Sequence, residues 1–314
     1  MNINSWLLAG SLALLLSACQ TPPPAEPPPP VPPVVTAPVQ TVPPAPPVVV
    51  PPPAPPRPPR IGLALGGGAA RGFAHIGVIQ VLDEAGIRPV LVAGTSAGSL
   101  VAALWASGLS GAEIERMAQS IEESTLADWG FPGRGLLRGD ALARYVRERT
   151  GGRLIEQMPR ALGIVATDLD SGDAILFRRG DPGLAVRASS AVPAVFLPVR
   201  IGAREYVDGG LVAPVPVSHA RSMGADLVIA VDISESPEGQ PTGDPFSLLL
   251  QTFSIMGRSI NRFELREADV VIRPALDGVP GTDFSVRQRA LQAGRAAALA
   301  ALPALRARIA ELTR

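Results

Sequence analysis

Short apolar segments alternate with helix-like segments from Ile61 to the end of the chain. Continuous apolar runs predict strands that are buried on both faces of a sheet, and we place them at Ile61–Leu65, Val90–Ala93, Leu162–Thr167, Ala174–Arg178, Glu205–Val207, Asp226–Asp232 and Val270–Arg273. Helical periodicity predicts helices near Ala74–Ala85, Ser99–Ala106, Gly111–Glu122, Asp140–Thr150, Gly183–Ser189, Val217–Met223, Phe246–Ala268 and Val286–Glu311. Pro303 favours a break in the last helix. The alternation predicts an α/β fold with three layers (αβα), in which helices cover both faces of a central, mostly parallel sheet.

The first sixty residues follow neither pattern. Trp6–Ala18 is an apolar run of the length found in secretory signal peptides, and it is too short to span a bilayer comfortably. Leu16–Cys19 resembles the lipobox of bacterial lipoproteins. The resemblance implies a signal peptide at residues 1–18 and a lipidated Cys19 in the cell envelope, and Gln20 favours the outer membrane, facing the periplasm. The alternative is a buried N-terminal helix.

Thr21–Arg60 is a proline tract without helical periodicity. Such a tract forms a solvated polyproline II spacer rather than a core element. We therefore expect residues 19–60 to be a disordered stalk, with a ligand for a proline-binding partner as the alternative. The globular domain is then residues 61–314, long enough for one sizeable core. We divide it into a core at 61–273 and C-terminal helices at 284–312.

Composition excludes several classes of function. The 28 basic and 28 acidic residues cancel, so no nucleic-acid partner is expected. The chain has no lysine, which excludes Schiff-base chemistry and a P-loop. The single cysteine excludes an intrachain disulfide. No His or Cys cluster has metal-ligand spacing, and we predict no metal and no cofactor.

Gly94–Gly98 reads G-T-S-A-G and lies between a predicted strand and a predicted helix. This is the setting of a nucleophile elbow, in which a serine is exposed on a tight strand-to-helix turn. Gly94 and Gly98 would let a second backbone approach closely, and the helix N-terminus would favour developing negative charge. Ser96 is therefore the candidate nucleophile.

Three further blocks accompany this elbow: a triple glycine from Gly66 to Gly68 after the first strand, the segment Ala191–Pro198, and Asp208–Gly210 at a strand end. Together and in this order, from about Arg60 to Arg273, they resemble the patatin-like phospholipase family. The resemblance implies a calcium-independent lipid acyl hydrolase that cleaves a phospholipid or another fatty-acyl ester. It also implies a Ser–Asp dyad in place of a Ser–His–Asp triad.

The resemblance and the chemistry of ester hydrolysis assign the site residues. Ser96 is the nucleophile and Asp208 the general base. Backbone amides of the triple glycine would stabilise the tetrahedral oxyanion, with Arg71 holding the loop. The complete set of assigned positions is Ser96, Asp208, Gly66, Gly67, Gly68 and Arg71, supported by Gly94, Gly98, Gly209 and Gly210, with Cys19 for lipidation.

Other residues of the chain are compatible with alternative functions. His219 follows Asp208, so a histidine-assisted serine hydrolase or a peptidase is formally possible, whereas His75 suits a hydrogen-bonded packing residue. The glycine loop lacks the third glycine of a dinucleotide-binding fingerprint, since Arg71 occupies that position. Asp168 and Asp170 have the wrong spacing for a calcium loop and fit a polar strand end. A non-catalytic envelope lipoprotein scaffold with the same fold is the remaining alternative.

Overall fold

The structure is a computed structural model that describes residues 57–121, 128, 134–240, 242–279, 281 and 284–313. The predicted signal peptide, the lipobox with Cys19 and the proline tract up to residue 56 lie outside the described residues. Among the described residues, no helix is both long and apolar enough to cross a membrane.

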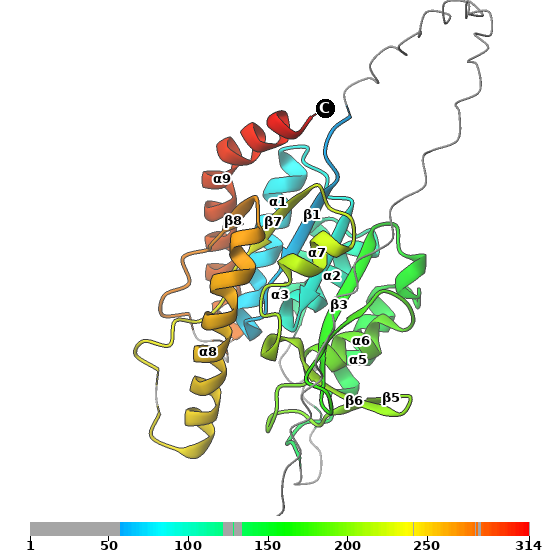
Figure 1. The fold of residues 1–314 in the computed structure, drawn as a ribbon, viewed down its shortest axis with the longest axis vertical. Helices are drawn as coiled ribbons and strands as arrows, with labels where there is room; N and C mark the ends of the chain where they lie inside the picture. Colours follow the sequence, from blue (N-terminus) through cyan, green and yellow to red (C-terminus); the bar gives the residue numbers. More distant parts are fainter. Residues whose placement is uncertain are drawn as a thin grey trace, which may run out of the picture. The chain divides into compact units, whose positions relative to one another are not determined.

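Strands and helices alternate much as the sequence predicts (Figure 1). The strands are β1 (Ile61–Leu65), β2 (Leu91–Thr95), β3 (Ala161–Asp168), β4 (Ala174–Phe177), β5 (Val199–Ile201), β6 (Arg204–Asp208), β7 (Leu227–Val231) and β8 (Val270–Ile272). The α-helices are α1 (Phe73–Glu84), α2 (Ala97–Ala106), α3 (Gly111–Ser120), α5 (Asp140–Arg149), α6 (Pro182–Ser189), α7 (Val217–Ser222), α8 (Pro245–Glu264) and α9 (Arg287–Leu312). Short 3₁₀ turns are η1 (Ala69–Gly72), η2 (Ile155–Gln157), η3 (Gly209–Leu211), η4 (Leu265–Glu267) and η5 (Phe284–Val286).

Within the described residues, the strands form one eight-stranded sheet in the order β5-β6-β3-β2-β1-β7-β8, with β4 paired to β3. The central pairs β3–β2, β2–β1, β1–β7 and β7–β8 are parallel, whereas β4, β5 and β6 add antiparallel pairs at one side. The predicted fold class, a mostly parallel sheet between helices, is confirmed. Strand β5 is an element that the sequence prediction did not include.

Alternate side chains of the central strands enter two separate cores. Leu63 and Leu65 of β1 belong to the core under α1, α2 and α9. Ala64, between them, belongs to the opposite core, where α7 packs through Val217 and Ala220. Because successive strand residues point to opposite faces, the apolar run of β1 is explained by burial on both sides.

One edge of β3 carries two strands end to end. β2 pairs with β3 up to Val165, and β6 pairs with it from Ala166 onward. β4 pairs with the stretch Ile164 to Thr167, which overlaps both partners, so β4 occupies the other edge. β2 runs parallel to β3 and β6 runs antiparallel, so their carboxyl ends meet head to head. The residues at that junction are brought together by the register of the sheet.

Helix α9 passes through Pro303 without ending. The predicted break is therefore wrong, although Figure 1 shows the last turns of α9 bent relative to the first. Proline removes one intrahelical hydrogen bond and clashes with the preceding turn, which bends a helix that packing holds in place. Leu291, Ala298 and Leu305 supply that packing against the core.

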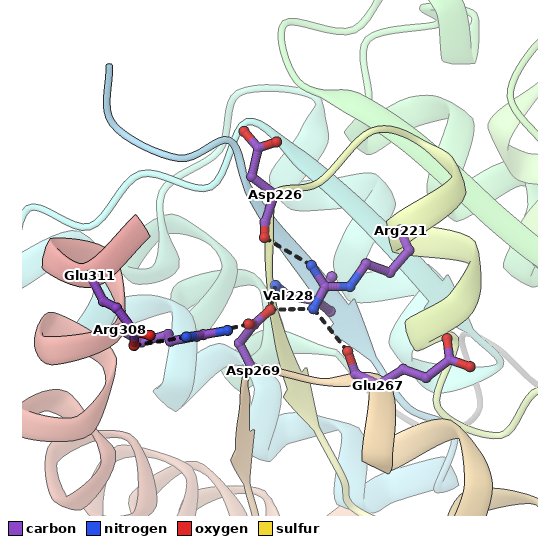
Figure 2. A network of polar contacts seen from close by, with 7 residues as sticks. All are labelled: Arg221, Asp226, Val228, Glu267, Asp269, Arg308 and Glu311. Atoms are coloured by element: carbon purple, nitrogen blue, oxygen red, sulfur yellow. Dashed lines mark hydrogen bonds and ion pairs between the residues drawn. The ribbon is translucent and has the colours of Figure 1, made fainter. Parts of the chain in front are cut away.

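A buried carboxylate ties the last strand to two helices (Figure 2). Asp269, at the start of β8, accepts a hydrogen bond from the Val228 amide at 2.9 Å and one from Arg308 Nε of α9 at 3.0 Å. Arg221 of α7 pairs with the same carboxylate, and its guanidinium also donates to the Glu267 carbonyl at 2.9 Å. The side chain of Asp269 is only 5% exposed. It therefore fixes α7 and α9 to the same corner of the sheet.

Removing this carboxylate leaves the Val228 amide without its acceptor and takes one ion-pair partner from each of two arginines. We expect Asp269→Ala to lower the free energy of unfolding by about 3 kcal/mol, because breaking a buried ion pair on one side exposes the partner to the full desolvation penalty. Arg273→Ala is the control, since its pair with Asp232 at 3.2 Å involves an arginine side chain that is 62% exposed. That change should cost less than about 1 kcal/mol. Equal losses in chemical denaturation would contradict the role of Asp269.

Candidate active site

Ser96 lies at the turn between β2 and α2. Its backbone has φ 52° and ψ −125°, and non-glycine residues rarely adopt such a positive φ. A Cβ on Gly98 would lie 2.2 Å from the Leu65 carbonyl oxygen, and a Cβ on Gly94 would lie 2.6 Å from that of Gly98. Both positions therefore require glycine, so that α2 can start directly against the ends of β1 and β2.

The hydroxyl of Ser96 donates to Asp208 Oδ2 at 2.7 Å. This contact joins the two strand ends at the junction on β3, because Ser96 follows the last residue of β2 and Asp208 is the last residue of β6. A serine at a helix N-cap usually accepts from the first-turn amides. Ser96 makes no such capping bond, and its hydroxyl is committed to the carboxylate.

Asp208 is buried and held on both sides. Its Oδ1 accepts from the Gly210 amide at 2.7 Å, and its own carbonyl accepts from Thr167 Oγ1 at 2.8 Å. Burial raises the pKa of Asp208 to about 6, although the hydrogen bonds from Ser96 and Gly210 favour the ionised form. A Cβ on Gly209 would lie 2.2 Å from the Val165 carbonyl oxygen. The D-G-G block thus places a carboxylate of raised proton affinity against the serine hydroxyl.

Ser189, the last residue of α6, bonds to the turn between β2 and α2. Its hydroxyl accepts from the Ser96 amide at 2.9 Å and donates to the Val165 carbonyl at 2.5 Å. Sequence reasoning missed this residue, because a serine at the end of a short helix carries no local sign of a contact 93 residues away. Its position fixes the backbone of the candidate nucleophile.

Two of the three backbone amides in the glycine loop donate to carbonyls of other segments of the chain. The Gly66 amide donates to the Val231 carbonyl at 3.1 Å and that of Gly67 to the Pro214 carbonyl at 2.9 Å. Within the part of the chain that the structure describes, no acceptor is found for the Gly68 amide. The same holds for Ala97, the first residue of α2. The sequence analysis predicts all three glycines as oxyanion donors, and among them the Gly68 amide is the one without an acceptor in the described residues.

Arg71 and His75 support this loop from the protein interior. Arg71 is 6% exposed and its Nη1 pairs with Glu235 Oε1 at 2.9 Å. His75 is fully buried, and its Nε2 lies 2.8 Å from the Gly66 carbonyl oxygen. Since a carbonyl only accepts, Nε2 carries the proton. Burial lowers the pKa of His75 to about 4, so the ring is neutral and serves as a packing donor, as the sequence suggests.

His219 does not contact the dyad. It lies on α7, its Nδ1 is 3.4 Å from Ser218 Oγ, and burial lowers its pKa. The carboxylate opposite Ser96 is that of Asp208. Asp168 is likewise a strand-end residue, paired with Arg204 at 2.7 Å, and no cluster of metal-ligating side chains is found among the described residues.

Ser96 opens onto an apolar cavity of about 310 Å³. Its walls come from η1, α1, α2, α3 and α5, together with the segment after α6. Phe73, Ile76, Leu100, Leu104, Val192 and Phe196 are among its lining residues. Val192 and Phe196 belong to the block Ala191–Pro198, which accompanies the serine turn in the sequence. The arrangement places Ser96, whose hydroxyl donates to Asp208, at the wall of a largely apolar cavity.

Comparison with known proteins agrees with this fold. The sequence model of the patatin-like phospholipase family matches residues 63–221. An uncharacterized NTE family protein of Mycobacterium tuberculosis (strain ATCC 25618 / H37Rv) is 34% identical over 274 residues, which cover 78% of this chain and 46% of that protein. Patatin-like phospholipase domain-containing protein 6 of Mus musculus is 33% identical over 187 residues, covering 57% of this chain and 14% of its own length.

The crystal structure of VipD from Legionella pneumophila shares the fold, with a TM-score of 0.51 and 17% identity over 79% of this chain and 67% of that chain. The helix-flanked, mostly parallel sheet makes this a protein of the α/β class with a patatin-like fold. The match of the family model over residues 63–221 shows that the chain belongs to the patatin-like phospholipase family. It spans about half the length of the mycobacterial relatives it matches, 51% in one case and 46% in another.

Because the pKa of Asp208 is raised in the folded protein, we predict that the free energy of unfolding depends on the ionisation of this carboxyl. A carboxyl whose pKa is about 6 in the folded state and about 4 when unfolded destabilises the fold once it is ionised. The stability that the neutral form confers is complete below about pH 4 and is lost as the pH rises through about 6. Asp208→Asn should therefore raise the free energy of unfolding by about 3 kcal/mol at pH 8.

The gain should shrink towards zero at about pH 4, where wild-type Asp208 is also neutral. Thermal unfolding of both proteins across this pH range measures it. Thr167→Val serves as a control for a polar change nearby, since it does not titrate. A gain in Asp208→Asn that is independent of pH would contradict a raised pKa.

Proposed function

We propose that the protein is a serine acyl hydrolase of the phospholipase A, lysophospholipase or esterase type, which cleaves fatty-acyl esters through a Ser96–Asp208 dyad. The observation that carries this proposal is the 2.7 Å hydrogen bond from Ser96 Oγ to Asp208 at the wall of an apolar cavity. Membership of the patatin-like phospholipase family supports lipid esters as the substrate class.

In the proposed mechanism, Ser96 Oγ attacks the ester carbonyl while Asp208 takes the hydroxyl proton. Collapse of the tetrahedral intermediate breaks the ester C–O bond, and Asp208 returns the proton to the leaving alcohol. The acyl group is then bound to Ser96. Water attacks this acyl-enzyme while Asp208 takes its proton. The bond between Ser96 Oγ and the acyl carbon then breaks, Asp208 returns the proton to Ser96, and the fatty acid is released.

The oxyanion is stabilised by backbone amides near Ser96. Gly68 and Ala97 are the proposed donors, since neither amide has an acceptor among the described residues and Ala97 begins α2. Gly66 and Gly67 donate to carbonyls instead, and they shape the loop. One oriented donor is typically worth about 3 kcal/mol of transition-state stabilisation. Arg71, through its pair with Glu235, holds the loop in place.

Dyad removal tests the proposal. We expect Ser96→Ala and Asp208→Asn each to reduce kcat/KM on a fatty-acyl ester by about 10³-fold or more, whereas His219→Ala keeps nearly full activity. Wild-type kcat/KM should rise with pH through about 6, as Asp208 loses its proton and becomes a competent base. Initial rates on esters of increasing acyl-chain length give kcat/KM for the wild type and the three variants, and a pH series gives the dependence on Asp208.

Two results would point elsewhere. Loss of activity in folded His219→Ala to the level of Ser96→Ala would favour a histidine-assisted hydrolase. An intact wild-type protein without activity on any lipid ester would favour the non-catalytic scaffold.

We further propose that the protein is anchored in the bacterial cell envelope through lipid on Cys19, in the outer membrane and facing the periplasm. The lipobox-like Leu16–Cys19 and Gln20 support this. A single acyl chain binds membranes only marginally, and two or more anchor stably.

The anchor predicts a processed N-terminus. Mass spectrometry of the native protein should find Cys19 as the first residue, carrying acyl chains, and the protein should fractionate with membranes. Cys19→Ala should remain as the longer precursor. An unmodified N-terminus at Met1 in a soluble fraction would overturn the anchor and leave the hydrolase proposal intact.

A further inference from the structure

Helix α8 has an apolar face directed to solvent. Leu248, Ile255, Met256 and Phe263 are 55%, 54%, 45% and 66% exposed. Counted from Leu248, the other three follow at seven, eight and fifteen residues, which places all four on one side of a helix with about 3.6 residues per turn. A surface helix ordinarily turns polar residues to this side. The apolar stripe of α8 therefore needs a separate explanation.

The opposite side of α8 is already occupied by the protein. Asn261 accepts from the Val215 amide at 3.2 Å, and its Nδ2 donates to Ser234 Oγ at 2.9 Å. Glu264 accepts from Ser218 Oγ at 2.8 Å. These bonds fix the rotation of the helix about its axis. The stripe is thus held outward rather than being a second candidate for the core.

Between Asp244 at the N-cap of α8 and Glu264 at its last position, the charges beside the stripe are positive. Residues 245–263 contain Arg258 and Arg262 and no acidic residue. Arg258 forms an exposed pair with Glu238 at 3.3 Å. No ion pair of Arg262 is found among the described residues, and Arg266 lies 5.5 Å over the Phe263 ring. An apolar stripe flanked by arginines complements an anionic lipid surface, where apolar groups enter the headgroup boundary and cations meet phosphate.

A second copy of the chain fits the stripe less well. A helix–helix seam needs apolar residues at every third and fourth position. In α8 the intervening positions on this side are Thr252 and Ser259, which interrupt the row between Leu248 and Phe263. A lipid interface tolerates such hydroxyls, because they can bond to headgroups and water.

The helix is also next to the candidate active site. It follows β7, which is parallel to β1 and β2, so the chain enters α8 from the sheet edge where Ser96 lies. Figure 1 shows the first turns of α8 extending past β1 and β7. Val215, which bonds to Asn261, follows Pro214, whose carbonyl accepts from the Gly67 amide. A surface that contacts α8 is therefore brought close to the glycine loop.

We propose that the outward face of α8 docks the protein on an anionic lipid bilayer, through Leu248, Ile255, Met256 and Phe263 with Arg258 and Arg262 beside them. The proposal rests on the proposed function in one respect, that a bilayer is where the lipid ester is found. Docking by α8 is separate from the proposed Cys19 anchor. The anchor would only tether the chain to a membrane, whereas docking by α8 would orient the domain on the membrane surface.

A single fluorescent label tests the contact in the full-length chain. Cys19 is the only cysteine, so a Cys19→Ser background accepts one new cysteine labelled with an environment-sensitive dye. Ser259→Cys places the dye on the stripe, and Glu148→Cys places it on α5, which Figure 1 shows on the other side of the molecule. The probes are vesicles of phosphatidylcholine with or without half phosphatidylglycerol, with brominated acyl chains.

The expected result is a blue shift and bromine quenching at position 259 on the anionic vesicles, a weaker response on neutral ones and none at position 148. The readout is local, so membrane attachment elsewhere in the chain does not produce it. No response at position 259 on anionic vesicles overturns the proposal. A response there that depends on protein concentration without vesicles also overturns it, because it identifies a second copy as the occupant.

Kinetics supply an independent test. In the double variant Ile255→Asp/Met256→Asp, the ratio of turnover on phosphatidylglycerol vesicles to turnover on a soluble short-chain ester should fall about tenfold, since binding scales with the apolar area immersed. Leu299→Asp on α9 is the matched control, with a leucine that is 51% exposed, and it should keep the wild-type ratio. An unchanged ratio in the double variant overturns the proposal. If the wild type hydrolyses neither substrate, the proposed function fails, and the label still decides docking.

Discussion

The hydrogen bonds along one edge of β3 determine where the reactive groups lie. Val165 is the last partner of β2 and Ala166 the first partner of β6, so the sheet itself brings Ser96 to Asp208. A slip of one residue in either pairing would turn every side chain of that strand to the other face. Thr167 Oγ1 on the Asp208 carbonyl and Ser189 Oγ on the Val165 carbonyl reinforce the same register. The dyad distance is thus a property of strand pairing rather than of two flexible side chains.

This rigidity is needed because the site contains unfavourable features. Ser96 has a positive φ, which costs on the order of 1–3 kcal/mol, and Asp208 is buried with no cation from the described residues acting on it. Both are maintained by close backbone packing at Gly94, Gly98 and Gly209, where a Cβ would collide with a carbonyl. A serine without a positive φ would have a less strained backbone. A better solvated carboxylate would be more stable when ionised, and it would be less basic. The same burial that destabilises ionised Asp208 makes it a stronger proton acceptor for the serine hydroxyl.

Much of the fold could be predicted from the sequence, because burial on both faces makes the central strands continuous apolar runs. Strand β5 (Val199–Ile201) was missed, since it is short and partly exposed and its pairing is with β6. The helix through Pro303 was misjudged because its continuity comes from tertiary packing. In the candidate site, motif order could pair Ser96 with Asp208, which the structure brings into hydrogen-bond contact. It could not show that the Gly66 and Gly67 amides are occupied, because their acceptors, Val231 and Pro214, come from distant segments.

Helix α8 shows a further limit of periodicity. A hydrophobic pattern reports that a face is apolar, but it does not say which apolar face is turned inward. In α8 that choice is made by polar contacts, since Asn261 and Glu264 bind the segment from Val215 to Ser218. Once those bonds fix the helix, the apolar stripe from Leu248 to Phe263 is left outside. A cluster of large exposed apolar groups is unfavourable in water, and this cost is the physical reason for our proposal that a lipid surface covers the stripe.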